Sequence, residues 1–230
     1  TALEARNALT LLADGTLDNR QGSLLGNRTT LGSAALRNDA GLIQGDRQLT
    51  LTATGTVSNG KGRLLAGESL TVNAASLDNN LGQVTSDGTL DLTITEQLLN
   101  QGGRLTAGGP LQVRSNELDN RQAGLLTSGG AMTLDVASLD NRAGEIASVA
   151  SLTATGARLD NSAGGRLIAN GALQLTLARL DNQAKGIVSG QQSVTIVAGQ
   201  VDNSTLGSLY GKTGLSLLLR SGSGVNGQLN

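Results

Sequence analysis

The sequence predicts an all-β fold: a right-handed parallel β-helix (a β-solenoid) of about ten coils, each with 20–21 residues and three short strands. Three recurring patterns lead to this prediction. They are a Leu-x-Asn or Val-x-Asn triplet, a Gly-x-aliphatic triplet after it, and an alternation of apolar and polar residues. One copy of these patterns is too short to bury its apolar face, whereas stacked copies share a continuous core. The right hand is expected because crossovers between parallel strands are nearly always right-handed.

The asparagine that closes each triplet sets the period. It recurs ten times, at Asn19, Asn38, Asn59, Asn79, Asn100, Asn120, Asn141, Asn161, Asn182 and Asn203. The ten residues span 184 positions in nine intervals, a mean of 20.4 residues. No apolar period of 3.6 residues occurs within a repeat, so helices are not expected. Coils stacked at about 4.8 Å would then form a rod of roughly 50 Å.

The glycine column and the alternating column define the strands. Each Asn is followed three or four residues later by a triplet such as Gly103-Arg104-Leu105, and this variable gap is typical of a turn. We expect the glycine to adopt a positive φ or to allow a close approach of neighbouring coils. Stretches such as Leu49-Thr50-Leu51 and Met132-Thr133-Leu134 alternate with period two, which is typical of a strand with one buried face. Pro110 comes directly before the strand expected at Leu111.

The Leu-Asp-Asn triplet is expected to form an inward-facing corner. Leu and Asn lie two residues apart, so both side chains face the core if the segment is extended. A buried amide needs partners for its carbonyl and its NH₂ group, and stacked asparagines can supply them to one another. The sequence therefore predicts a structural asparagine ladder made of the ten residues named above. A row of ligand-binding asparagines is the functional alternative.

An aspartate stands between Leu and Asn in seven repeats. These residues are Asp18, Asp78, Asp119, Asp140, Asp160, Asp181 and Asp202. We expect solvated turn carboxylates, held by backbone N–H groups or by the nearby Arg20, Arg121 and Arg142. A ladder of divalent cations and a pair of catalytic carboxylates are the alternatives, although Arg37 and Leu99 would interrupt such a ladder.

The composition narrows the classes of function. The chain contains no His and no Cys, Tyr210 is its only aromatic residue, and the formal net charge is −1. We therefore predict no catalytic, cofactor-binding or metal site, no cofactor and no nucleic-acid partner. No apolar run approaches the roughly 20 residues of a membrane span.

A single repeat array is expected over residues 1–230. Leu9-Thr10-Leu11 supplies one strand of an incomplete first coil, and the last coil, at about 211–230, is irregular because Ser221-Gly222-Ser223-Gly224 interrupts the spacing. The chain has no starting Met and no signal peptide, and we see no polar cap at either end. We expect a fragment that is flanked by further coils of the same parent chain.

The Leu-Asp-Asn, Gly-x-Leu/Ile and Leu-Thr-Leu columns resemble the haemagglutinin repeats of filamentous haemagglutinin-type exoproteins over about residues 9–218. The resemblance implies a β-helix in a filament that a two-partner-secretion transporter of the outer membrane exports to the surface of a Gram-negative cell. The family includes adhesins and the rods of contact-dependent growth inhibition systems.

The function that we predict is a structural rod segment that presents adhesive or toxin modules to target cells. Direct adhesion of this segment to a glycan or protein is the alternative, and Tyr210 would be its only aromatic platform. A polysaccharide-active β-helix enzyme is a remote third possibility, because no acid–base pair stands out from the regular Asp column. We predict that the chain is not an enzyme.

Overall fold

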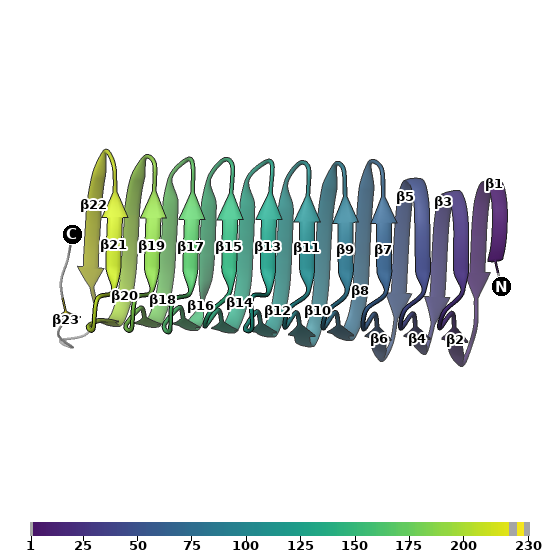
Figure 1. Ribbon diagram of the computed structural model, residues 1–230, viewed down its shortest axis with the longest axis horizontal. Helices are drawn as coiled ribbons and strands as arrows, with labels where there is room; N and C mark the ends of the chain where they lie inside the picture. Colours follow the sequence, from purple (N-terminus) through teal and green to yellow (C-terminus); the bar gives the residue numbers. More distant parts are fainter. Residues whose placement is uncertain (1, 221–224, 228–230) are drawn as a thin grey trace.

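The protein is a single column of stacked β-coils (Figure 1). The computed structural model describes residues 2–220 and 225–227, which form 23 strands and no helix. Every strand pairing is parallel, and each strand between the first and last coils pairs with its counterparts in the coils before and after. In Figure 1 the nearer strands run upwards and the fainter ones downwards as the chain advances from right to left, which is a right-handed winding. The predicted fold class is confirmed.

The strands fall into three groups: those of the first coils, the four-residue strands of the later coils, and the remaining strands of the later coils. In the first coils they are β1 (Ala2–Leu12), β2 (Thr16–Asp18), β3 (Ser23–Ser33), β4 (Ala35–Arg37), β5 (Leu42–Ala53) and β6 (Thr56–Ser58). From there on, the short strands are β7 (Arg63–Ala66), β9 (Gln83–Ser86), β11 (Arg104–Ala107), β13 (Leu125–Ser128), β15 (Glu145–Ser148), β17 (Arg166–Ala169), β19 (Ile187–Gly190) and β21 (Ser208–Gly211). The remaining strands are β8 (Ser69–Asp78), β10 (Thr89–Leu99), β12 (Leu111–Asp119), β14 (Met132–Asp140), β16 (Leu152–Asp160), β18 (Leu173–Asp181), β20 (Ser193–Asn203), β22 (Gly214–Leu219) and β23 (Val225–Gly227).

Each coil has three paired segments, although two of them belong to one continuous strand. Between β12 and β14 the pairing runs from Leu111 to Ser115, omits Asn116, and resumes at Glu117. In the first coils the continuity lies at a different corner, where β3 joins two segments across a register shift between Gly26 and Arg28.

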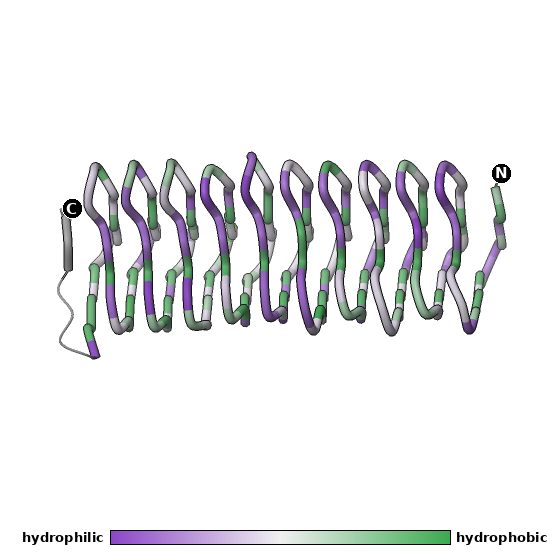
Figure 2. Tube along the Cα trace, turned by 90° about the horizontal axis from the view of Figure 1, so that it is seen from below, coloured by the Kyte–Doolittle hydropathy of each residue, from purple (hydrophilic) through white to green (hydrophobic). Residues whose placement is uncertain are grey.

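The core is a set of aliphatic columns. Leu90, Leu111, Met132, Leu152 and Leu173 follow one another in register, and each is at most 1 % exposed. Burying such a side chain stabilises the fold by about 1.5–3 kcal/mol. Figure 2 shows hydrophobic segments at the same place in successive coils. Because every layer is alike, Leu, Ile, Val and Ala, together with Met132, fill the described interior without aromatic residues.

Two details differ from the sequence prediction. The first coil contains three paired segments before Asn19, because Ala2–Ala5 pairs with Ser23–Gly26 and Thr16–Asp18 pairs with Ala35–Arg37, in addition to the predicted strand around Leu9. The alternating column also includes Leu152 and Ala154, both buried, where Ala replaces the second large aliphatic residue and weakens the pattern in the sequence.

The end of the array lies partly outside the described residues. β21 and β22 follow β19 and β20 in register. β23 then pairs Val201 with Val225, an offset of 24 residues. The Ser-Gly segment 221–224, to which the predicted irregularity was attributed, is not among the described residues.

Candidate functional site

The ten predicted asparagines lie at one corner of the coil and are buried, with exposures of 6 % for Asn19 and 0 % for the others. From Asn19 to Asn182, each Nδ2 donates a hydrogen bond to the Oδ1 of the asparagine in the next coil. All nine distances are 2.7 or 2.8 Å. The amides therefore form one uninterrupted chain with a single direction, an arrangement in which the bonds polarise one another.

Each ladder amide also contacts backbone carbonyl groups. Asn120 Nδ2 donates to the Gly124 oxygen at 2.9 Å and to the Glu145 oxygen of the next coil at 3.3 Å, besides the Asn141 side chain. Its backbone N–H donates to the Asp140 carbonyl at 2.8 Å. One asparagine thus holds its own turn and attaches it to the following coil.

The glycine after each ladder residue is required by close approach and not by a positive φ. A Cβ on Gly103 would lie 2.1 Å from the Asn79 backbone oxygen and 2.5 Å from Asn100 Oδ1. Left-handed φ values occur one position earlier, at Gly102 in this turn. The predicted close approach is therefore confirmed, whereas the alternative of a positive φ at this glycine is wrong.

The variable turn length has a simple geometric account. Where Asn and Gly are three residues apart, one residue between them is left-handed, such as Lys61 with φ 55°. Where they are four apart, two consecutive residues are left-handed, such as Gln122 at 56° and Ala123 at 62°. The extra residue is absorbed within the turn, so the next strand keeps its register.

The aspartates of the triplet face outward beside the ladder. Asp18, Asp119 and Asp140 each accept a hydrogen bond from the backbone N–H two residues later and ion-pair with the arginine at that position. The prediction that Arg20, Arg121 and Arg142 face these carboxylates is confirmed. The Arg20 side chain lowers the pKa of Asp18 to about 2.

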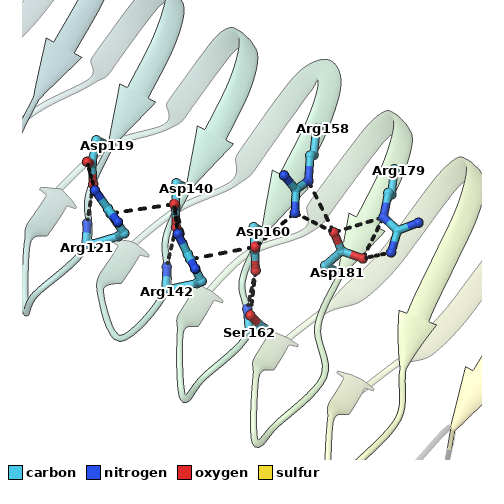
Figure 3. Close-up of polar contacts among 9 residues, drawn as sticks. All are labelled: Asp119, Arg121, Asp140, Arg142, Arg158, Asp160, Ser162, Arg179 and Asp181. Atoms are coloured by element: carbon cyan, nitrogen blue, oxygen red, sulfur yellow. Dashed lines mark hydrogen bonds and ion pairs between the residues drawn. The ribbon is translucent and has the colours of Figure 1, made fainter.

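Asp160 and Asp181 are not solvated, and for them the sequence prediction is wrong. Their exposures are 8 % and 2 %. Arg158 and Arg179 lie over them, as Figure 3 shows, with Arg158 placed 3.1 Å from both carboxylates. Burial alone would raise the pKa of Asp181, but hydrogen bonds from Arg179 and Arg158 outweigh it and lower that pKa.

The two arginines could have been found from the sequence. Each lies two residues before the aspartate of its triplet, and residues two apart on a strand share a face. The same position is Gln200 in the next coil, where it accepts a hydrogen bond from Arg179 at 2.7 Å.

The described residues contain no group of three or more Asp or Glu side chains placed to hold a metal ion. Within the same residues, no helix is long and apolar enough to cross a membrane. Burial alone would raise the pKa values of Asp119 and Asp181, but hydrogen bonds from their guanidinium partners and, for Asp119, from Gln101 lower both. This arrangement suits cross-linking of coils and not proton transfer, since a general acid needs a pKa near the working pH.

The fold and the ladder define the class of protein as a parallel β-solenoid built from one repeat. The chain belongs to the haemagglutinin repeat family, whose profile matches residues 2–61, 48–102, 85–176 and 157–226. The resemblance seen in the sequence is confirmed, and haemagglutinin repeats of this kind suggest an adhesin-type filament rod. No significant match was found among curated proteins or among solved structures.

Proposed function

We propose that this chain is a rod segment of a large secreted bacterial surface filament, and that it presents adhesive or toxin modules to target cells. The family supports an extended surface protein. The presenting role is supported by the constant register of the coils along the array.

The observation that carries the proposal is the constant register of the short strands. The positions of Arg63, Gln83, Arg104, Leu125 and Glu145 coincide in successive coils, and the series continues to β21. The described residues include no long inserted loop that could wall a groove, because short turns connect the strands throughout. A surface that repeats from coil to coil without a distinct site suits a spacer, because the property that matters in a spacer is its length.

The proposal includes export through an outer-membrane transporter, with further coils of the parent chain on either side. The ladder fits such export because each coil that emerges finds donors and acceptors already placed on the coil before it. Docking coil by coil would supply free energy outside the inner membrane. Replacing Leu126 and Asn141 together should then stall export, whereas undiminished surface display would argue against folding-driven export.

The rod role is tested by deleting one coil from the parent protein. Removal of residues 104–124 joins Gly103 to Leu125, which occupies the register position of Arg104. We expect normal surface display and an active presented module. As the matched control, removal of residues 104–113 takes out half a coil and breaks the register, and we expect display to fail.

Direct adhesion by this segment predicts a different outcome. In that case purified chain would bind target cells saturably without the presented module, and substitutions on one outer face would abolish binding. Such a result would replace the rod proposal by an adhesive one.

A further inference from the structure

A continuous side-chain network runs along the outside of the rod, next to the ladder, over six coils. Its members are Gln101, Asp119, Arg121, Asp140, Arg142, Asp160, Arg158, Asp181, Arg179 and Gln200, in order of contact. Figure 3 shows its charged part. We call this set the charge chain.

The contacts between coils are what make it a chain. Arg121 Nε lies 3.6 Å from Asp140 of the next coil, and Arg142 Nε lies 3.7 Å from Asp160. Arg158 bridges Asp160 and Asp181, at 3.1 Å from each. Consecutive coils from residue 119 to residue 181 are therefore joined by ion pairs.

The charge chain is balanced and closed at both ends. Four aspartates alternate with four arginines, so every charge has an opposite neighbour and the sum is zero. Gln101 donates to Asp119 at 2.6 Å at one end, and Gln200 accepts from Arg179 at 2.7 Å at the other. Isolated surface ion pairs contribute little, whereas networks with buried members such as Asp181 contribute more.

In the described part of the chain before residue 100, the triplet aspartates make no ion pair with a neighbouring coil. Asp18 pairs with Arg20 of its own coil, and Leu99 stands where a carboxylate would be needed to extend the chain. Among the described residues before position 100, the ion pair that joins neighbouring coils is Arg47–Glu68, and both of its side chains are about half exposed.

The regularity of strand pairing changes near the same place. Register shifts occur between Ala5 and Ala8, between Gly26 and Arg28, and between Ile94 and Gln97. The described pairings from β12 through β22 have none. Bulges leave backbone N–H and C=O groups of the sheet unpaired and locally weaken it. Two independent features thus separate residues 2–99 from residues 101–203.

We propose that the charge chain divides the rod into two parts of unequal stability, of which residues 101–203 open last. Residues 2–99 form the part that opens first under heat, denaturant or pulling force. In a repeat protein each coil contacts only its neighbours, so such a difference in local stability can persist along one array. The inference does not depend on which module the rod presents.

Hydrogen exchange of the whole 230-residue chain, read by mass spectrometry, tests the proposal. β5 and β18 are compared because each is the third long strand from its end, which cancels fraying of the termini. We expect backbone amides of β18 to exchange about tenfold or more slowly than those of β5. Equal rates, or faster exchange in β18, would overturn the inference.

Two variants and a matched control link the difference to the charge chain. Asp181→Asn keeps the side-chain shape and removes the shared buried charge, and Arg142→Gln breaks the chain at a side chain that is 43 % exposed. We expect each variant to raise exchange in β18 about fivefold or more and to leave β5 unchanged. Asp18→Asn is the matched control, because it removes the same kind of turn carboxylate outside the charge chain. If Arg142→Gln altered β18 no more than Asp18→Asn did, the charge chain would not be the cause.

Discussion

Replacement of Asn120 by Ala is the perturbation that probes the ladder most cleanly. It removes the Nδ2 hydrogen bonds to Asn141 Oδ1 at 2.8 Å and to the Gly124 oxygen at 2.9 Å. It also removes the acceptor that Asn100 uses at 2.7 Å. Asn100 Nδ2 keeps the Gly103 and Leu125 oxygens at 3.2 and 3.4 Å, whereas Asn141 Oδ1 loses its donor.

The magnitude follows from these contacts. A net hydrogen bond contributes about 1 kcal/mol, and the two ladder bonds to Asn100 and Asn141 therefore account for about 2 kcal/mol. A buried acceptor left without a donor, here Asn141 Oδ1, costs at least about 1 kcal/mol more. We expect Asn120→Ala to lower the free energy of unfolding by about 3 kcal/mol. For a chain of this length that corresponds to a fall in melting temperature of about 6–12 °C.

Thermal unfolding followed by far-ultraviolet circular dichroism measures this change. The control is Asn116→Ala in the same coil, because Asn116 is exposed. Its melting temperature should stay within about 2 °C of the unmodified chain. Equal melting temperatures for the Asn120 and Asn116 variants would show that the ladder does not hold the coils together.

Three further predictions concern the turns and the charges. Gly103→Ala should lower the free energy of unfolding, measured by urea titration, by about 2–3 kcal/mol, because its Cβ would lie 2.1 Å from a backbone oxygen. Gly15→Ala is the control: a Cβ there meets nothing within 4 Å, so this variant should be neutral or slightly stabilising. Gly102→Ala should lower the free energy of unfolding by about 1 kcal/mol, because φ is +60° at this position. Ala143→Gly, at φ 54°, should raise the free energy of unfolding. The pKa of Asp181 is lowered on folding. The ionised carboxylate therefore stabilises the fold above about pH 4, and this stabilisation is lost as the pH falls through the lowered pKa. Melting temperature should therefore drop more between pH 5 and pH 2 in the unmodified chain than in Asp181→Asn, and equal drops would contradict this assignment.

The architecture could be predicted from the sequence because one period governs every layer. A spacing of 20–21 residues with an inward Asn and a period-two apolar stretch leaves a stacked parallel coil as the arrangement that buries the apolar residues. The ten asparagines could be placed at a corner because Leu and Asn two residues apart face the same way.

What could not be predicted depended on contacts between coils or on backbone angles. Left-handed residues such as Leu81 and Ala143 carry no glycine signal, because the surrounding turn imposes their conformation. The arginines two residues before Asp160 and Asp181 can be found in the sequence, but the contact of Arg158 with Asp181 of the next coil cannot. The Ala2–Ala5 segment of β1 lacks the Gly-x-aliphatic signature and is defined only by its pairing with the second coil.

The most direct test of the rod is the length of the surface filament, measured by electron cryotomography of intact cells. Removal of residues 104–186 joins Gly103 to Ile187, at the same register position, and takes out four coils. We predict a filament shorter by about 19 Å, at about 4.8 Å per coil, that still presents an active terminal module. A filament of unchanged length, or loss of target-cell binding while the terminal module remains exposed and active, would contradict the account.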